Sequence, residues 1–338
     1  MVLYMMHCKE NLEICSDQIV IEDYLQELDI STIRNDIILG LSAQDKHISS
    51  KYFYDEKGSA LFEKITLLPE YYPAHCEKEI LRKLDISFIP DFKDLNIWEL
   101  GSGDHTKISL IIDRIPVRHQ NSLIYHPVDI SRSAMQLAAI KLLEIYPDIR
   151  ICGIVADFMH QLDVISHGSN CLLCFLGGTI GNFTLQERSD FLANMHHIMN
   201  DGDFFLLGVD TVKSRQVLYD AYNDKQGITA AFNLNILNVV NTLCKTDFNS
   251  EDFEHIALFN EDKKRIEMYL EARTDILVKS PFTPNEIKIR KGERIHTENS
   301  HKFDDEMIMQ MVETSGFRVS KVFSDDNAWF KVILFHKA

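Results

Sequence analysis

The sequence is poor in basic residues, in proline and in low-complexity stretches, and each shortage excludes a class of protein. Lys and Arg total 35 against 51 Asp and Glu, which gives a formal net charge of -16. A surface of this sign repels polyanions, so nucleic acids and anionic membranes are not expected partners. Proline accounts for only 8 of 338 residues, and 45% hydrophobic with 25% charged residues is typical of a folded globular protein.

Long apolar runs and paired metal-ligand motifs are also missing. No run of about 18 uncharged apolar residues predicts a membrane span. The apolar start at Met1–Cys8 lacks the basic leader of a signal peptide. The 7 Cys do not suggest a disulfide framework, and the 14 His form neither an HxxxH nor an HExxH pattern. We therefore expect a cytoplasmic protein with reduced thiols and no metal site.

From Leu95 onward, short apolar runs alternate with helical segments. The runs that predict strands are Asn96–Leu100, Leu123–Val128, Arg150–Val155, Cys171–Leu176 and Phe204–Val209. The helices between them are predicted at about residues 107–114, 131–145 and 185–199. Strands that alternate with helices predict right-handed crossovers and a doubly wound parallel sheet.

The flanking segments do not follow this alternation. Residues 18–40 and 58–83 are predicted to be largely helical. Residues after Asp210 are interpreted as an insertion, with a helix at 228–241, an acidic loop at 247–254 and a strand-like alternation at 265–278. A helix at 303–314 and strands at 316–323 and 329–335 would then complete the sheet.

A glycine turn follows the first predicted strand of this sheet. Gly101 and Gly103 let the backbone approach a ligand closely, and Glu99 precedes them. A dinucleotide-binding fingerprint would have a third glycine where Thr106 stands, so the turn does not favour NAD. Glu-x-Gly-x-Gly at this place resembles the motif with which class I methyltransferases hold S-adenosylmethionine.

Acidic residues also follow the next two predicted strands. Asp129 could accept hydrogen bonds from both ribose hydroxyls, and Asp157 with Phe158 could bind the adenine amino group and cover the ring. Lys107 could pair with the cofactor carboxylate. Each acid alone is equally compatible with a helix cap or a turn. Their occurrence at successive strand ends favours a ligand site, because ligands of open α/β sheets bind there.

Longer motifs resemble one family: the histidine N-alpha-methyltransferases of ergothioneine biosynthesis, with their relatives that methylate other amino acids. The resemblance extends from Lys51 to Phe335. The motifs that carry it are Lys51–Ser59, Leu68–Pro73, the Glu99 turn, Gly177–Phe183, Ala221–Asp224, Thr229–Asn233 and Ile295–Phe303.

The resemblance implies an α/β protein with a class I Rossmann-like methyltransferase sheet and a second, substrate-binding domain. Residues 1–72 would form the N-terminal helical part of the substrate-binding domain, and residues 211–302 its inserted part. Residues 73–210 would form the S-adenosylmethionine-binding domain, and residues 303–338 would complete its sheet.

The resemblance also implies where the substrate backbone lies. Asn182 and Tyr222 match the amide and phenol that hold the substrate carboxylate, and both groups can donate to it. Tyr54 matches the family tyrosine near the substrate amine and is the catalytic candidate. The backbone around Gly177 would leave space for added methyl groups. Without the resemblance, Asn182 is equally compatible with a loop cap and Tyr222 with a half-buried helix aromatic.

Selectivity for histidine would come from Glu298 and Ser300, which match the family's imidazole-binding pair, with Tyr71 alongside. Residues i and i+2 of an extended segment share a face, so this pair can approach one ring. An indole or aliphatic side chain would leave these polar groups unpaired, at a cost of about 1–3 kcal/mol each. Taken alone, Glu298 is equally compatible with a surface charge.

The implied reaction is in-line attack of the neutral histidine amine on the methyl group of S-adenosylmethionine, repeated until trimethylhistidine (hercynine) forms. The alternatives are a related methyltransferase with another amino-acid acceptor and a silent ligand-binding protein. A nucleic-acid methyltransferase is disfavoured by the acidic charge. We expect a small-molecule substrate, no nucleic-acid or membrane partner, and a monomer.

Overall fold

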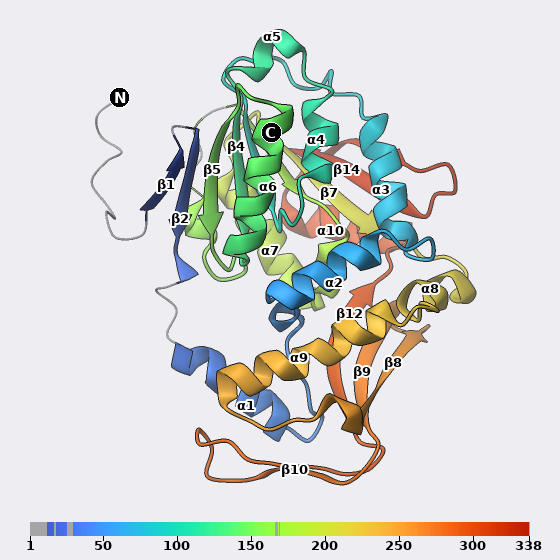
Figure 1. Ribbon diagram of the computed structural model, residues 1–338. Helices are drawn as coiled ribbons and strands as arrows, with labels where there is room; N and C mark the ends of the chain where they lie inside the picture. Colours follow the sequence, from blue (N-terminus) through green and yellow to red (C-terminus); the bar gives the residue numbers. More distant parts are fainter. Residues whose placement is uncertain (1–11, 17, 26–29, 166–167, 169, 338) are drawn as a thin grey trace.

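A mixed nine-stranded sheet forms the centre of the computed structural model, which describes residues 12–16, 18–25, 30–165, 168 and 170–337 (Figure 1). Its strand order is β1-β2-β5-β4-β3-β6-β7-β14-β13. The strands are β1 (Leu12–Ser16), β2 (Ile19–Asp23), β3 (Asn96–Leu100), β4 (Ile124–Asp129), β5 (Arg150–Val155), β6 (Cys171–Phe175), β7 (Phe204–Asp210), β13 (Arg318–Ser324) and β14 (Phe330–His336). The strands from β2 to β7 in this order run parallel, whereas β1, β14 and β13 pair antiparallel with their neighbours.

Helices cover both faces of this sheet because its central strands are apolar on both sides. All five residues of β6 are buried: Leu172 and Cys174 join one apolar cluster, and Leu173 and Phe175 join the other. The first cluster lies under α3 (Tyr72–Arg82), α4 (Thr106–Ile112) and α6 (Arg132–Ile145). The second lies under α7 (Leu185–Ile198) and α10 (Asp305–Ser315). The predicted doubly wound sheet is therefore confirmed.

The strand order reverses between β3 and β6. The chain leads from β3 outward to β4 and β5 on one side, and from β6 to β7 on the other. Loops that leave β3 and β6 therefore diverge and open a crevice at the carboxyl ends of these strands, where ligands of open α/β sheets bind.

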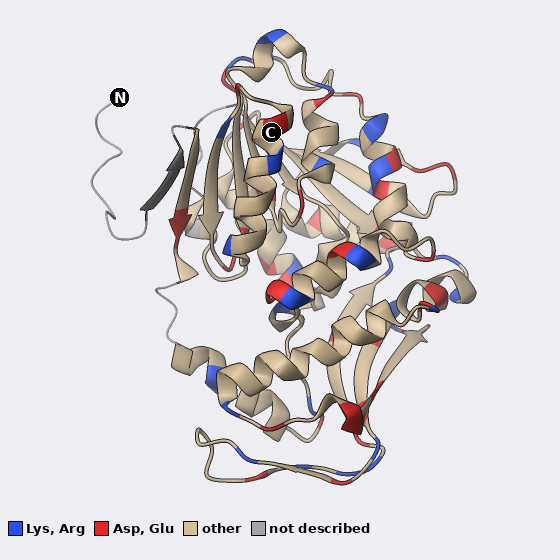
Figure 2. Cartoon of the chain, in the orientation of Figure 1, with Lys and Arg blue, Asp and Glu red and all other residues tan. Residues whose placement is uncertain are grey.

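A smaller region lies below the large sheet in Figure 1. A three-stranded antiparallel sheet has the order β12-β9-β8, and β10 and β11 form a separate pair. The elements of this region are α1 (Ile30–Ser42), η2 (Ser50–Phe53), α2 (Glu56–Thr66), α8 (Arg215–Tyr222), α9 (Ile228–Cys244), η5 (Ser250–Asp252), β8 (Phe253–Asn260), β9 (Arg265–Ala272), β10 (Ile276–Val278), β11 (Ile287–Ile289) and β12 (Arg294–His301). Helix α9 carries no charged residue and is tan in Figure 2. It packs between α1, α2 and the small sheet, where a charged side chain would be buried.

The two sheets meet where β7 and β12 end. The Phe303 amide donates to the Asp210 carbonyl at 2.7 Å, and Thr211 pairs with Phe303 in an isolated bridge. Side chains at the end of β12 thus reach the crevice of the large sheet.

Three predictions about the flanks are wrong. Residues 19–23 are not helical but form β2, parallel to β5, because Ile19 and Ile21 alternate with half-buried residues in a β-branched run. The predicted helical segment 1–72 thus contributes β1 and β2 to one side of the large sheet, and residues 1–11 lie outside the described part. The acidic loop gives way to β8 at Phe253, and the single run at 265–278 is two strands. The four-part domain division stays a prediction.

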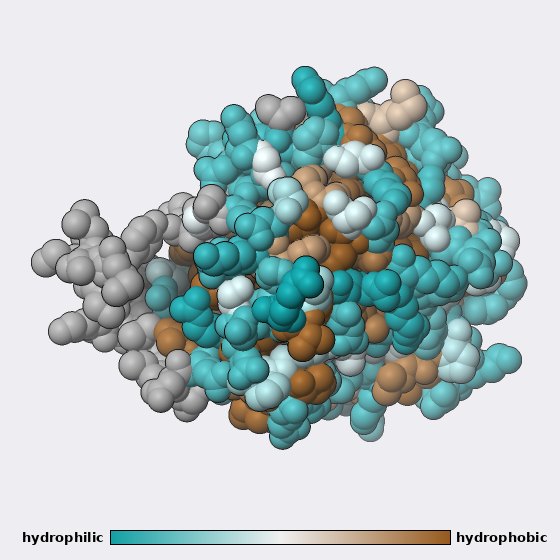
Figure 3. All heavy atoms as spheres, turned by 90° about the horizontal axis from the view of Figure 1, so that it is seen from above, coloured by the Kyte–Doolittle hydropathy of each residue, from teal (hydrophilic) through white to brown (hydrophobic). Residues whose placement is uncertain are grey.

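The surface follows the composition. Hydrophilic side chains cover most of the face seen in Figure 3, with apolar side chains between them. Within the described residues, no helix has the length and apolarity needed to cross a membrane.

Candidate active site

A cavity of about 1360 Å³ opens at the crevice, between the large sheet and the smaller region. Its upper wall is made of loops that follow β3, β4, β5 and β6, and its lower wall includes α2 and β12. Of the residues predicted to bind the cofactor, it is lined by Gly101, Gly103, Lys107, Asp129, Asp157 and Phe158.

The glycine turn forms an open floor in this cavity. Gly101 has φ 65° and Gly103 has φ 54°, a left-handed conformation that favours glycine. A Cβ on Gly103 would meet no atom within 4 Å, so a ligand can lie against the backbone. Asp129 braces the turn, because its carboxylate accepts from the Gly103 amide at 2.9 Å and from the Ser131 amide at 2.9 Å. Asp129 is therefore a turn residue and also lines the cavity.

Glu99 lies beneath the turn and does not line the cavity. Its carboxylate accepts from the Tyr125 hydroxyl at 2.6 Å. Burial raises the pKa of Glu99 to about 8, against the attraction of Lys107. Three polar atoms buried near the turn have no hydrogen-bond partner among the described residues: Glu99 Oε1, Ser102 Oγ and His105 Nδ1. Ser102 and His105 line the cavity, and their polar groups, with the open glycine floor, fit a ligand that carries amino, carboxylate and hydroxyl groups, as S-adenosylmethionine does.

Asp157 and Phe158 occupy the loop after β5. The Asp157 carboxylate accepts from the Met159 amide at 3.1 Å and lies 3.7 Å from the Lys51 ammonium. The Phe158 ring packs edge-on against Phe175, with centroids 5.5 Å apart. Asp157 is therefore also a turn residue, and its link to Lys51 connects the large sheet to the smaller region.

Glu77 is a functional candidate that sequence reasoning missed. It is 1% exposed, accepts from the Gly177 amide at 2.7 Å and 2.9 Å, and lies 3.4 Å from the Lys107 ammonium. A Cβ on Gly208 would lie 2.3 Å from Glu77 Oε1, so glycine is needed there. Only the fold brings α3, α4 and the loop after β6 together, so no local pattern marks Glu77.

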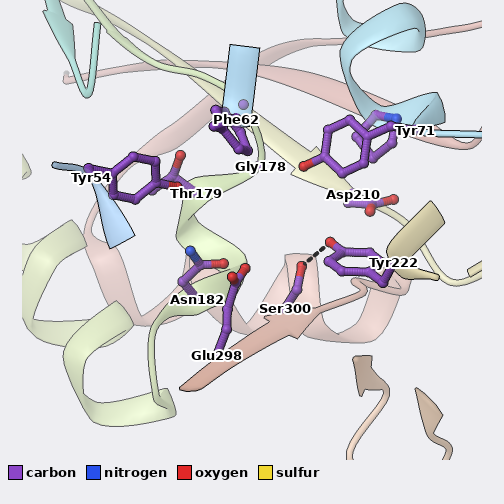
Figure 4. A pocket seen from close by; sticks show the side chains of 12 residues that line it. Tyr54, Phe62, Tyr71, Gly178, Thr179, Asn182, Asp210, Tyr222, Glu298 and Ser300 are labelled. Atoms are coloured by element: carbon purple, nitrogen blue, oxygen red, sulfur yellow. Dashed lines mark hydrogen bonds between the residues drawn. The ribbon is translucent and has the colours of Figure 1, made fainter. Parts of the chain in front are cut away.

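A smaller pocket lies at the inner end of the cavity, and all the residues predicted for substrate and catalysis line it (Figure 4). They are Tyr54, Tyr71, Gly177, Asn182, Tyr222, Glu298 and Ser300. Tyr54 follows η2, Tyr71 precedes α3, Asn182 ends η4 (Thr179–Asn182), and Tyr222 ends α8. Their individual roles remain predictions, but the fold brings them together from distant parts of the chain.

Glu298 and Ser300 project from β12 into this pocket (Figure 4). A bulge between His296 and Glu298 interrupts the pairing with β9, and regular pairing resumes from Glu298 to His301. The two side chains therefore share a face, as the spacing predicts. Burial raises the pKa of Glu298 to about 7, against the attraction of Lys302.

Aromatic side chains form another part of the pocket wall. Phe62 of α2 lies edge-on to Tyr54 and to Tyr71, at centroid distances of 5.7 Å and 6.2 Å. Burial holds the pKa of Tyr54 well above its ordinary value. Phe62 was not predicted from the sequence, because an apolar residue on a helix is typical of any core face.

A network of buried ions supports the pocket from behind. Lys302 is fully buried and lies 2.8 Å from Asp210 Oδ2, and Lys213 pairs with the other oxygen of the same carboxylate. The Tyr72 hydroxyl donates to Asp210 at 2.8 Å and 2.9 Å. Burial alone would raise the pKa of Asp210, but the two ammonium groups hold it below its ordinary value. Sequence reasoning missed this network, although Lys302 lies in a motif that carries the resemblance.

Tyr222 and Ser300 contact one another directly. The Tyr222 hydroxyl donates to Ser300 Oγ at 2.8 Å, the bond drawn in Figure 4. The sequence had assigned these hydroxyls to opposite ends of the amino acid. A ligand held by both must therefore bring its carboxylate and its ring close together.

No group of three or more His, Cys, Asp or Glu side chains in the described part of the chain is arranged to hold a metal ion. The polar groups of the site are carboxylates, hydroxyls, amides and ammonium groups. Such a donor set can bind an amino acid by hydrogen bonds and ion pairs.

Comparison with known proteins adds a family assignment. A family model described as a SAM-dependent, histidine-specific methyltransferase matches residues 33–337. A histidine N-alpha-methyltransferase of Mycolicibacterium smegmatis is 38% identical over 294 residues, covering 87% of this chain and 91% of that protein. One from Mycobacterium tuberculosis is 35% identical over 303 residues, covering 89% and 94%. Ergothioneine biosynthesis protein 1 of Neurospora crassa is 29% identical over 282 residues, covering 80% of this chain and 31% of that protein.

Proposed function

The chain belongs to the family of S-adenosylmethionine-dependent, histidine-specific methyltransferases, and on this premise we propose that it methylates the alpha-amino nitrogen of L-histidine. The product is N-alpha-trimethylhistidine (hercynine), formed by three successive transfers. In each transfer an N–C bond forms, the sulfur–methyl bond breaks and S-adenosylhomocysteine leaves. The first two methylated ammonium products lose a proton before the next transfer. The name of the Neurospora crassa relative supports a place in ergothioneine biosynthesis. The class I sheet supplies the cofactor half of the site, and the smaller region supplies the substrate half.

One observation carries this proposal: Glu298 and Ser300 share a pocket with Asn182, and Gly177 lines both this pocket and the larger cavity. A ring-binding pair, a carboxylate-binding amide and the cofactor crevice are therefore contiguous. An amino acid that spans this pocket presents its amine toward the crevice.

The pocket residues bind each part of histidine. Glu298 accepts from one ring N–H, and Ser300 donates to the other ring nitrogen. Asn182 and Tyr222 donate to the carboxylate. If Tyr222 binds the carboxylate and Ser300 the ring, their contact requires a folded side-chain conformer of histidine, with the carboxylate next to the ring.

The cofactor half holds and orients the methyl donor. S-adenosylmethionine supplies an electrophilic methyl group on a positively charged sulfur. Asp129 accepts from the ribose hydroxyls, Asp157 from the adenine amine, and Lys107 pairs with the carboxylate. The alignment of amine and donor supplies most of the acceleration, which in the best intramolecular models reaches about 7–11 kcal/mol.

Tyr54 orients the amine. A phenol is protonated at neutral pH, and burial raises the pKa of Tyr54 further, so Tyr54 is a neutral hydroxyl whose oxygen accepts from the amine N–H. Alpha-amino groups are largely protonated at pH 7, so the reactive amine is the minor neutral form. The aromatic rings of Tyr54, Phe62 and Tyr71 favour the ammonium as it gains methyl groups, through cation–π attraction.

An acceptor panel tests the proposal. The purified protein is incubated with S-adenosylmethionine and with histidine, tryptophan, tyrosine or phenylalanine in turn, and products are read by mass spectrometry. We expect mono-, di- and trimethylated histidine and no turnover of the other three. Turnover of another amino acid in preference to histidine would reject the substrate, and turnover of none would reject the activity.

A further inference from the structure

Lys302 is a buried cation that the proposed chemistry does not use. It follows β12 directly, its side chain is fully buried, and its ammonium lies at the back of the substrate pocket. It donates to Asp210 at 2.8 Å, to Ser300 Oγ at 2.8 Å and to the Tyr222 hydroxyl at 3.0 Å. An ammonium has three hydrogens and no acceptor, so these three bonds account for all of them.

These bonds determine what Ser300 can offer a ligand. Its oxygen accepts from Lys302 and also from the Tyr222 hydroxyl, each at 2.8 Å. A hydroxyl oxygen has two lone pairs, so only the Ser300 hydrogen is left for a ligand. If Tyr222 turns its hydrogen to the substrate carboxylate, Lys302 still occupies one lone pair on each oxygen.

We propose that Lys302 is a positioning residue for histidine specificity: it makes Ser300 and Tyr222 hydrogen-bond donors toward the substrate. The proposal rests on the proposed function. The site then presents an acceptor at Glu298 and a donor at Ser300, which matches a neutral imidazole with one N–H and one bare nitrogen. A protonated imidazolium has no bare nitrogen, so it cannot accept the Ser300 hydrogen.

The charge balance around the pocket is a second argument for a role of Lys302 in binding the substrate. Asp210 already pairs with Lys213, whose side chain is 4% exposed and which also donates to Tyr72 and to the Thr211 carbonyl. Lys213 alone already balances the charge of the Asp210 carboxylate, so the charge of Lys302 is not needed to neutralise Asp210. With Glu298 ionised, the two carboxylates and two ammonium groups sum to zero, and Lys302 favours that ionised acceptor.

Lys213 provides a matched control. It is a buried lysine on the same carboxylate, but no hydrogen bond joins it to Ser300 or Tyr222 among the bonds found in the described residues. Lys302→Met and Lys213→Met therefore remove the same charge from the same network. Only Lys302→Met removes the ammonium that donates to the Ser300 and Tyr222 hydroxyls.

The experiment is isothermal titration of each variant with S-adenosylhomocysteine, and then of the loaded protein with L-histidine. We expect Lys302→Met to weaken histidine binding by roughly 10- to 100-fold and S-adenosylhomocysteine binding by less than about threefold. Lys213→Met should change histidine binding by less than about threefold. Equal losses in the two variants would overturn the proposal, because they would show a general effect of lost charge.

A double-mutant cycle with Ser300→Ala separates positioning from folding. If Lys302 acts through Ser300, then Lys302→Met should cost much less in the Ser300→Ala background than in the native protein. Additive losses would contradict the proposal.

If Lys302→Met fails to fold, as judged by circular dichroism, Asp210→Asn/Lys302→Met removes both charges of the pair and is measured against Asp210→Asn alone. We expect the same 10- to 100-fold weakening between these two, and no difference would overturn the proposal. If the native protein itself neither binds nor methylates histidine, the proposed function fails instead.

Discussion

The two halves of the cavity are built differently. The cofactor half consists of loops that follow neighbouring parallel strands, and its central acid, Asp129, is held by backbone amides of Gly103 and Ser131. The substrate half is assembled from residues that lie far apart along the chain, and side-chain bonds hold it, such as those of Lys302 to Ser300 and Tyr222. Sheet topology thus places the cofactor groups, whereas a buried polar network places the substrate groups.

This difference assigns separate tasks to the halves. Backbone amides and glycine turns fit a ligand common to many proteins of one fold, and they say little about the acceptor. A network in which each hydroxyl has a fixed direction rejects ligands that leave its members unpaired, at about 1–3 kcal/mol for each group. Acceptor specificity should therefore change with the substrate half alone.

The largest expected effect is on the cofactor half. We predict that Asp129→Ala weakens S-adenosylhomocysteine binding by about 100-fold or more, because it removes the carboxylate proposed to accept from two ribose hydroxyls. Titration calorimetry measures this loss. Asp157→Ala should lose less, since Asp157 would serve one amino group. Equal and small losses in both variants would show that the cofactor lies elsewhere in the cavity.

A smaller effect is expected on the substrate half. Glu298→Ala should weaken histidine binding by roughly 10- to 100-fold, because a charge-assisted hydrogen bond to the ring is lost. S-adenosylhomocysteine binding should stay within about threefold of the native value. Comparable losses for both ligands would mean that the halves are not separable, and an unchanged histidine affinity would remove Glu298 from the site.

The sequence predicts the cofactor half better than the substrate half. The apolar runs predict β3 and β5 to the residue, and Gly101, Gly103 and Asp129 stand out because strand ends converge at one edge of a parallel sheet. Residues of the substrate pocket have no shared local pattern, and only the family resemblance assembled them. Glu77 and Lys302 were not identified because Gly177 and Asp210, the partners of their buried charges, are distant in the chain. Strand β2 was misread because a short apolar run fits either period.

Glu77 marks where the two halves touch. Its carboxylate holds the Gly177 amide, which borders the substrate pocket, and the Lys107 ammonium of the cofactor half. Gly177 has φ 82°, and a Cβ there would lie 3.0 Å from Lys107 Nζ, so the loop approaches as closely as glycine permits. The halves are therefore distinct in construction but share one buried contact.

The smallest expected effect is a difference in pH dependence between histidine binding and S-adenosylhomocysteine binding. Burial raises the pKa of Glu298 to about 7, so Glu298 is mostly protonated at about pH 6 and half ionised at about pH 7. Because the ionised form accepts the ring N–H, the ionisation of Glu298 alone should tighten histidine binding by up to about fivefold over this interval. Glu99, whose pKa is about 8, stays largely protonated there, so S-adenosylhomocysteine binding should stay level.

Glu298→Gln isolates this contribution, because the substrate imidazole also loses its proton in the same interval, with an ordinary pKa of about 6.5. In the variant only the substrate titrates, so histidine binding should change less with pH than in the native protein. Titration calorimetry at matched pH values gives both slopes. If the two slopes coincide, the ionisation of Glu298 does not control histidine binding in this interval, which contradicts the prediction.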